Sequence, residues 1–220
     1  ILAFGEGLKR HAGDDEKRAS EAADALDRAI SALKRQSKND PYFEALYRDA
    51  AELIKTYSVG GGAKLFWKQG NDLFQTEKKY AEAIAQFEQI DAKFLYYERA
   101  RVNIGRAQLM LGEFDKARQS LAAYRAFAKE NEIEARDTAR QDVRKVAMLE
   151  ADWAEVQMAY MEARGSTELK RKKDLAKYPE AVQKVEAFLA ANEKDGAQNQ
   201  MVVYSLEYLG RLAADQAQLD

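Results

Sequence analysis

The chain has 220 residues, of which 46% are hydrophobic and 33% are charged. It is long enough to bury a sizeable core, and its richness in Ala, Leu, Glu, Lys and Arg favours helices. The 35 basic and 37 acidic residues nearly cancel, so the strongly basic field that nucleic-acid binding requires is absent. The absence of cysteine excludes disulfides, thiolate metal sites and cysteine nucleophiles.

The N-terminal region shows no sign of a membrane anchor or a catalytic site. No apolar run approaches the roughly 20 residues that span a bilayer, so we expect no transmembrane segment. The chain begins at Ile1 rather than Met and has no cysteine, which slightly favours a soluble bacterial periplasmic or envelope-associated protein and leaves the compartment open. The single histidine, His11, is interpreted as a surface residue because a catalytic or metal site needs several partners held around it.

A stripe of one aromatic, one small and two larger apolar residues recurs along the chain. Its copies are Tyr47, Ala50, Ile54 and Tyr57; Tyr80, Ala83, Phe87 and Ile90; Phe114, Ala117, Leu121 and Tyr124; and Tyr178, Ala181, Val185 and Phe188. Spacings of three and four place each set on one helix face. Ala117 follows Ala83 by 34 residues, and Ala83 follows Ala50 by 33. This period predicts an array of helical hairpins in which alanine marks a close contact between helices.

The glycines Gly60 to Gly62, followed by Lys64, raise the question of a phosphate-binding loop. Such a loop needs lysine directly after its last glycine, then Ser or Thr, and a strand before it. Here Ala63 intervenes and a helix is predicted to precede. Glycine commonly ends a helix, so we interpret these residues as a linker between repeats.

The C-terminal half carries three further signals. The segment from Asp137 to Arg164 has no glycine or proline, which predicts one long helix. Another helix, predicted to cap the array, is indicated by Leu206, Leu209, Gly210 and Ala213. The basic run Lys170 to Lys173, with Lys177, is interpreted as a solvated face, with contact to an anionic partner as the alternative.

Two segments resemble the tetratricopeptide repeat family, whose pattern is W-x2-L-G-x2-Y…A-x3-F…P over 34 residues. In residues 64–97 the Trp, Tyr, Ala and Phe positions hold Trp67, Phe74, Ala83 and Phe87, and Gly70-Asn71 replaces the Leu-Gly pair. Residues 98–131 keep Ile104-Gly105, Ala117 and Leu121 but have Arg101 and Gln108 at the first two aromatic positions. Both segments lack the final proline.

The resemblance implies an all-α fold. We expect a right-handed superhelix, or α-solenoid, of about four helical hairpins with one long helix and a C-terminal capping helix. The expected single domain spans residues 1–220, with repeat units at 15–59, 63–97, 98–131 and 135–195 and a cap at 199–218.

The resemblance also implies a non-catalytic protein–protein interaction module, a scaffold or adaptor that holds a protein or peptide in a concave groove. The first helices of the repeats line that groove, which points to Lys68, Asp72, Gln75, Arg99, Val102, Arg106, Leu109 and Met110 as partner-binding residues. The last five lie off the apolar face formed by Ala100, Ile104 and Ala107, so we expect an exposed row that mixes arginine with apolar groups.

Such a row suits an acidic, partly apolar partner, and replacing Arg99 and Arg106 with glutamate should then weaken binding with little loss of stability. We expect no catalytic residues, no metal and no cofactor. The alternative function is a structural or self-assembling subunit that docks through residues 137–164, and an enzyme is the least favoured class. The identity of the partner and the oligomeric state stay open.

Overall fold

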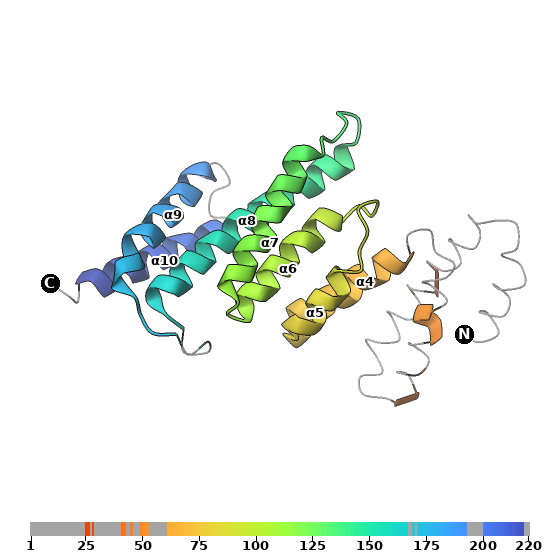
Figure 1. Cartoon of the computed structure of the whole chain (residues 1–220), viewed down its shortest axis with the longest axis horizontal. Coiled ribbons are helices and arrows are strands. Elements are labelled where there is room, and N and C mark those ends of the chain that lie inside the picture. The colour runs from red at the N-terminus through yellow and green to blue at the C-terminus, as the bar shows by residue number, and fades with distance from the viewer. Residues whose placement is uncertain are drawn as a thin grey trace, which may run out of the picture. The chain divides into compact units, whose positions relative to one another are not determined.

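The computed structural model describes residues 61–166, 169, 171–192 and 200–217, together with 25, 26, 28, 41, 42, 45 and 49–52. Its fold is all-α, as predicted (Figure 1). The chain divides into two compact units, Ile1–Tyr97 and Glu98–Asp220, and each is described by itself. His11, Tyr47, Ile54, Tyr57 and Gly60 lie outside the described residues. The superhelix, the single domain and the predicted unit boundaries therefore stay predictions.

In the first unit, α4 (Gly61–Asn71) continues into the π-helix η1 (Asp72–Glu77), and α5 (Tyr80–Phe87) packs back against α4. Ala83 and Phe87 are fully buried, which confirms the stripe on α5. The Trp67 ring stacks on Tyr96 at a centroid distance of 5.2 Å and tilts against Phe87 at 5.9 Å. Trp67 therefore belongs to an aromatic cluster inside this unit.

The linker interpretation is wrong for Gly61 and Gly62, which form the first residues of α4. The adjacent Ala63 and Leu65 are buried, at 5% and 6% exposure. Packing of these side chains outweighs the weak intrinsic preference of glycine against helix, so the helix begins earlier than residue type alone indicates.

Glycine contacts show where the two repeats correspond. A Cβ on Gly105 would lie 2.9 Å from Leu121 Cγ, and a Cβ on Gly70 would lie 2.6 Å from Phe87 Cε1. Gly70 is therefore the counterpart of Gly105, and the expected alignment of Asn71 with Gly105 is wrong by one residue. The π-helix η1 explains the shift, because a π-turn accommodates one extra residue between the packing glycine and the second helix.

The turns that end the first helices also correspond, 34 residues apart. Gly112 has φ +77°, and Lys78 has φ 58° in the left-handed region. Glycine adopts this conformation cheaply, whereas lysine is strained by its Cβ. The first repeat therefore keeps the helix-ending geometry of the second without the residue type that signals it.

The second unit contains α6 (Tyr97–Met110), α7 (Phe114–Glu130), α8 (Thr138–Arg164), the 3-10 turn η2 (Leu175–Lys177), α9 (Tyr178–Ala191) and α10 (Gln200–Ala217). The predicted long helix is confirmed as α8, and the Asp137 side chain caps it by accepting from Arg140 N at 3.1 Å. The stripes on α7 and α9 are buried along their length, as predicted.

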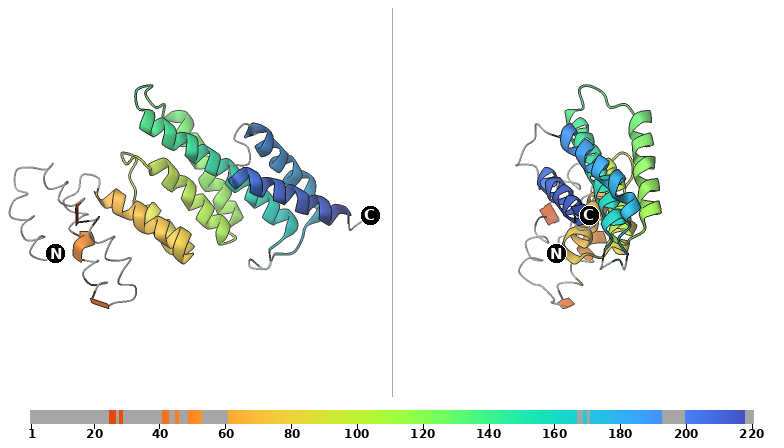
Figure 2. Two further views of the ribbon diagram at one scale, coloured as in Figure 1. Left: turned by 180° about the vertical axis from the view of Figure 1, so that it is seen from behind. Right: turned by 90° about the vertical axis from the view of Figure 1, so that its left-hand side faces the viewer.

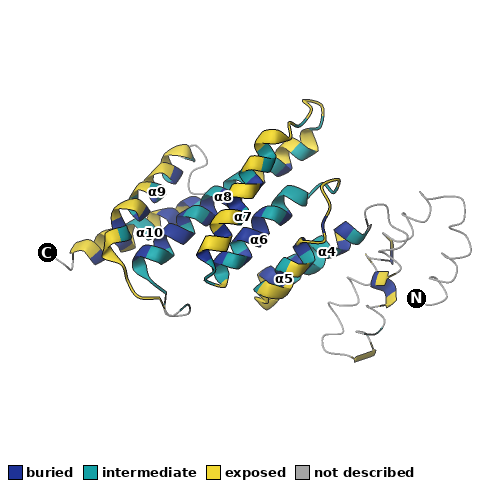
Figure 3. Ribbon diagram, viewed as in Figure 1, coloured by how far each residue is buried: buried dark blue, intermediate teal, exposed yellow. Residues whose placement is uncertain are grey.

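Two apolar clusters meet on α8. In one cluster, Ala147, Ala151, Ala154 and Met158 pack with residues of α6 and α7. In the other, Trp153, Val156, Ala159, Tyr160 and Ala163 pack with residues of α9 and α10. In the view from behind, α10 lies in front of α8 (Figure 2). From Ala147 to Arg164 no residue of α8 is exposed, and its exposed residues gather at the N-terminal end (Figure 3).

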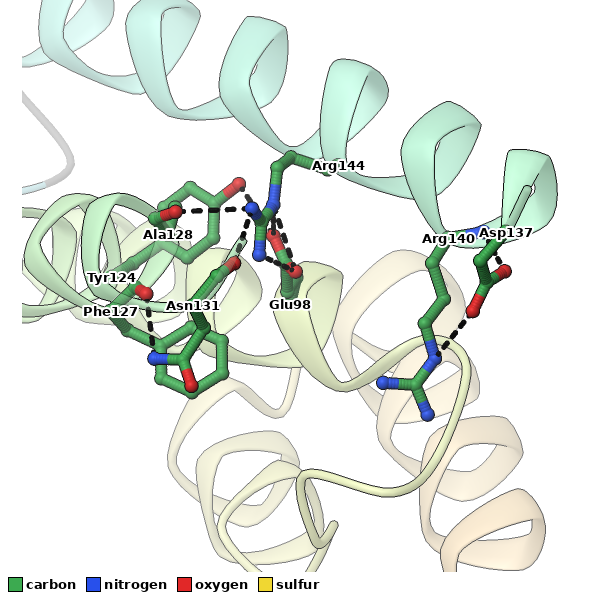
Figure 4. Close-up of polar contacts among 8 residues, drawn as sticks. All are labelled: Glu98, Tyr124, Phe127, Ala128, Asn131, Asp137, Arg140 and Arg144. Atoms are coloured by element: carbon green, nitrogen blue, oxygen red, sulfur yellow. Dashed lines mark hydrogen bonds and ion pairs between the residues drawn. The ribbon is translucent and has the colours of Figure 1, made fainter. Parts of the chain in front are cut away.

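Arg144 ties α8 to the ends of α6 and α7 (Figure 4). Its guanidinium donates to both carboxylate oxygens of Glu98, at 2.6 to 3.0 Å, and to the carbonyls of Ala128 and Asn131 at 3.0 and 2.7 Å. Glu98 lies in the first turn of α6 and also accepts from the Tyr124 hydroxyl at 3.2 Å. Each charge therefore complements a helix end, because the carbonyls at a C-terminus lack partners in the helix and an N-terminus favours a carboxylate.

Asp215 joins α10 to α8 and α9. Its carboxylate accepts from Arg164 Nε at 2.8 Å and from the Tyr178 hydroxyl at 2.9 Å, and it lies 3.0 Å from Lys173 Nζ. The Arg164 hydrogen bond, followed by those from Lys173 and Tyr178, lowers the pKa of Asp215 to about 2. This contact anchors the last described turns of α10.

The glycine contacts lead to a matched prediction. Gly105→Ala should lower the free energy of unfolding by about 1–2 kcal/mol net, because the new methyl overpacks Leu121. Gly210→Ala should instead raise it by up to about 1 kcal/mol, because nothing lies within 4 Å of the added Cβ and alanine is the better helix former. Urea denaturation of both variants measures the difference, and effects of the same sign would contradict the assigned contact.

Asp215 leads to a prediction on pH. Its folded pKa of about 2 lies below the ordinary 3.8, so the stability it contributes is present above about pH 4 and is lost as pH falls towards 2. Asp215→Asn should therefore destabilise the protein at pH 7. The difference in free energy of unfolding between the variant and the native protein should become smaller between about pH 4 and pH 2. Asp142→Asn, at an exposed site on α8, is the control. If this difference in free energy of unfolding stayed constant with pH, the charge of the Asp215 carboxylate would make no contribution to stability.

Candidate partner-binding surface

Arg99 and Arg106, predicted to contact a partner, converge on one carboxylate of α8. Arg99 binds Glu150 in a bidentate manner, with Nη2 at 2.5 Å from Oε1 and Nε at 3.0 Å from Oε2. Arg106 Nη1 lies 3.6 Å from the same Oε1 and donates to Asn103 Oδ1 at 3.1 Å. The Glu150 side chain is only 7% exposed, whereas those of Arg99 and Arg106 are 28% and 22% exposed.

This arrangement gives the two arginines a structural role. Burial lowers the pKa of Arg106, the Glu150 carboxylate opposes that shift, and the neighbouring Arg99 adds to it. A buried carboxylate is tolerated only when it is paired and hydrogen-bonded, so both arginines help to stabilise the α6–α8 contact. Replacing both with glutamate would place three carboxylates together, so we expect this change to destabilise the fold, contrary to the expectation from the sequence.

Val102 and Leu109 are buried, which corrects the expectation of an exposed row. Their exposures are 0% and 1%, and both belong to the cluster that α6 forms with α7 and α8. The expectation assumed that α6 buries a single face, but α8 covers a second one. Met110, at the end of α6, remains half-buried.

The first unit contributes Lys68, Asp72 and Gln75. Lys68 lies in the last turn of α4 and is half-buried, as is Asp72, while Gln75 in η1 is exposed. All three are thus at least partly accessible on their own unit. Whether they bind a partner stays a prediction.

A depression of about 250 Å³ between α7, α8 and α9 was not predicted. Its lining residues are Arg118, Ala122, Glu155, Met158, Ala159, Glu162 and Lys184. Burial tends to raise the pKa of Glu162, but Arg118 and Lys177 hold it below its ordinary value. The carboxylate therefore stays ionised near neutral pH, and its charge is already balanced by these two cations.

Residues 171–173 of the basic run are exposed, as expected of a solvated face, and two of them also contact the fold. The Arg171 guanidinium lies over the Phe114 ring, 4.0 Å from its centroid. Lys173 pairs with Asp215, and Lys177 lies 3.5 Å from Glu162. Lys170 lies outside the described residues. These contacts favour a structural role over an anion-binding one.

The described part of the chain shows neither a metal-binding cluster nor a membrane-spanning helix. No group of three or more His, Asp or Glu side chains could hold a metal ion in this part of the chain. None of the described helices is long and apolar enough to cross a bilayer.

Glu150 is the important residue that sequence reasoning missed. A signal was present, because Glu150 shares a helix face with Ala147 and Ala154, three residues before it and four after it, and both are buried. A lone carboxylate on an apolar face indicates a buried ion pair. The sequence does not say which cations complete it, because those lie on another helix.

The packing glycines, the left-handed turns and the alanine contacts recur from one hairpin to the next. Residues 75–141 match the tetratricopeptide repeat family model. The resemblance predicted from the sequence is thereby confirmed over this segment, which runs from η1 to the start of α8. Members of this family generally bind other proteins and are typically non-catalytic. Neither the curated proteins nor the solved structures gave a match to the chain.

The Glu150 cluster leads to a prediction on stability. Glu150→Ala should lower the free energy of unfolding by about 2–3 kcal/mol, because it leaves two partly buried guanidinium groups without their shared carboxylate. Glu113→Ala removes an exposed pair with Lys116 and should cost less than about 0.5 kcal/mol. Urea denaturation compares the two variants, and equal small losses would assign Glu150 no structural role.

Proposed function

We propose that this protein is a non-catalytic scaffold or adaptor that holds a partner protein or peptide on the first helices of its repeats. The observation that carries the proposal is the family match over residues 75–141, together with helical hairpins that repeat the same contacts in each unit. The contacts of this fold are local, so the fold offers an extended surface for binding. Fold analogy supplies the class of activity, and particular side chains must supply the specificity.

The proposed contact residues are those on the first helices that remain accessible. In the first unit they are Lys68, Asp72 and Gln75, and in the second Met110 and the exposed edges of Arg99 and Arg106. Lysine and arginine favour an acidic segment, and Met110 adds an adaptable apolar contact. Glu150 holds Arg99 in one orientation, so less side-chain entropy is lost when a partner contacts that arginine.

Docking of a partner on the long helix is less well supported. The exposed residues of α8 precede Ala147, and the rest of the helix lies between two apolar clusters. The most exposed surface for docking on α8 thus lies in its first turns, where Val146 is 40% exposed.

The proposal is tested once a partner has been captured from the native source and purified. Lys68→Glu combined with Met110→Glu should weaken that partner by at least about tenfold, or about 1.4 kcal/mol. The reason is that the double change repels an acidic segment and removes an apolar contact. Isothermal titration measures the affinity, and circular dichroism checks the fold.

The control is Lys129→Glu, which makes the same charge change as Lys68→Glu at an exposed site on the second helix α7. It should leave the affinity within about twofold of the native value, because surface charges away from a contact have small effects. Equal weakening by the control and the double variant would indicate a general charge effect. No weakening by either would place the binding surface elsewhere.

A further inference from the structure

The outward face of α10 is unusually apolar for a surface helix. Leu206 is 57% exposed and Val203 44%. With them on one side of the helix lie four small exposed residues, Gly210, Ala213, Ala214 and Ala217. The opposite side, which includes Val202 and Leu212, is buried against α8 and α9. A second helix could therefore pack closely on the outward face.

Gly70 and Gly105 show what such a face does elsewhere in this chain. Each packs directly under a large apolar side chain of the following helix, Phe87 or Leu121. At Gly210, by contrast, no described atom lies within 4 Å of the position of a Cβ. Within the described residues, α10 thus presents a helix-packing face without the helix that would cover it.

The order of residues on this face makes it complementary to itself. The large residues lie in its N-terminal half and the small ones in its C-terminal half. If two copies cross antiparallel at Gly210, then Leu206 of one lies opposite Ala214 of the other, and Val203 lies opposite Ala217. A two-fold axis produces this exchange, in which each large residue meets a small one.

The charges beside the face fit the same arrangement. Glu207 and Arg211 lie on one flank of α10, form an ion pair within the helix, and have side chains 44% and 51% exposed. In an antiparallel pair, each flank of one helix lies beside the same flank of the other. Measured along the helix axis, Glu207 of one copy is then about 3 Å from Arg211 of the other. Both copies contribute this pair, which adds two attractions across the axis. The two copies of Arg211 also lie about 3 Å apart along the axis and add one repulsion, so the attractions outnumber it.

We propose that α10 is a self-association surface on which a second copy of this chain binds antiparallel through its own α10. A single helix pair forms a small interface, so the dimer dissociates on dilution. Sedimentation equilibrium of the native chain should show the mass rise from monomer towards dimer with concentration. Leu206→Glu should remain monomeric with unchanged circular dichroism, because the side chain is exposed within one copy.

Charge reversal gives the decisive experiment. Glu207→Arg alone and Arg211→Glu alone should each weaken association by at least about tenfold, because like charges then face each other across the axis. An equimolar mixture of the two variants should recover association, because one copy then carries two arginines on this flank and the other two glutamates, so every pair across the axis is of opposite sign. The pair within each helix is the same in the mixture as in the separate variants, so it cannot explain the recovery.

Three results would overturn the proposal. They are a native chain that stays monomeric at every concentration, an association that Leu206→Glu leaves unchanged, and a mixture that fails to recover. The residues tested for binding of a heterologous partner, Lys68 and Met110, lie outside α10, so the two proposals can fail independently.

Discussion

Burial of α8 from two sides is the constraint on which the second unit depends. Ala147, Ala151 and Ala154 allow α6 and α7 to approach one side of the helix. On the other side, Trp153 and Tyr160 pack with α9 and α10. Both rings stack on Tyr208 of α10, with ring-centroid distances of 5.4 Å for Trp153 and 3.9 Å for Tyr160. Small residues on one side and aromatic ones on the other let a single helix serve both clusters, because close packing needs complementary shapes.

Ion pairs also connect α8 to the neighbouring helices. Arginines from the neighbouring helices meet carboxylates of α8, as Arg99 meets Glu150 and Arg125 meets Asp152. In the ion pair between Arg144 and Glu98 the roles are exchanged, because the arginine lies on α8 and the carboxylate on α6. Charges committed to the fold in this way are costly to change, so a charged residue on a first helix is weak evidence of a binding site until its partners are known.

The two proposals assign different partners to two accessible surfaces. Under the two proposals, the accessible lysine, methionine and arginine edges of the first helices would contact a partner, whereas the apolar face of α10 would contact a copy of itself. If both proposals hold, self-association would present two binding surfaces at once, and a partner with two sites would be held more tightly than by one copy.

The stripes of Ala83, Ala117 and Ala181, the long helix and the family resemblance followed from the sequence alone, because helical spacing and local residue type determine which face of each helix is apolar. Tertiary structure decided the rest. It buried Val102 and Leu109 under α8, directed Arg99 and Arg106 to Glu150, and shifted the register of the first repeat through a π-turn. The first two outcomes depend on residues far apart in the chain, and the periodicity of a single helix carries no information about which neighbour covers its second face.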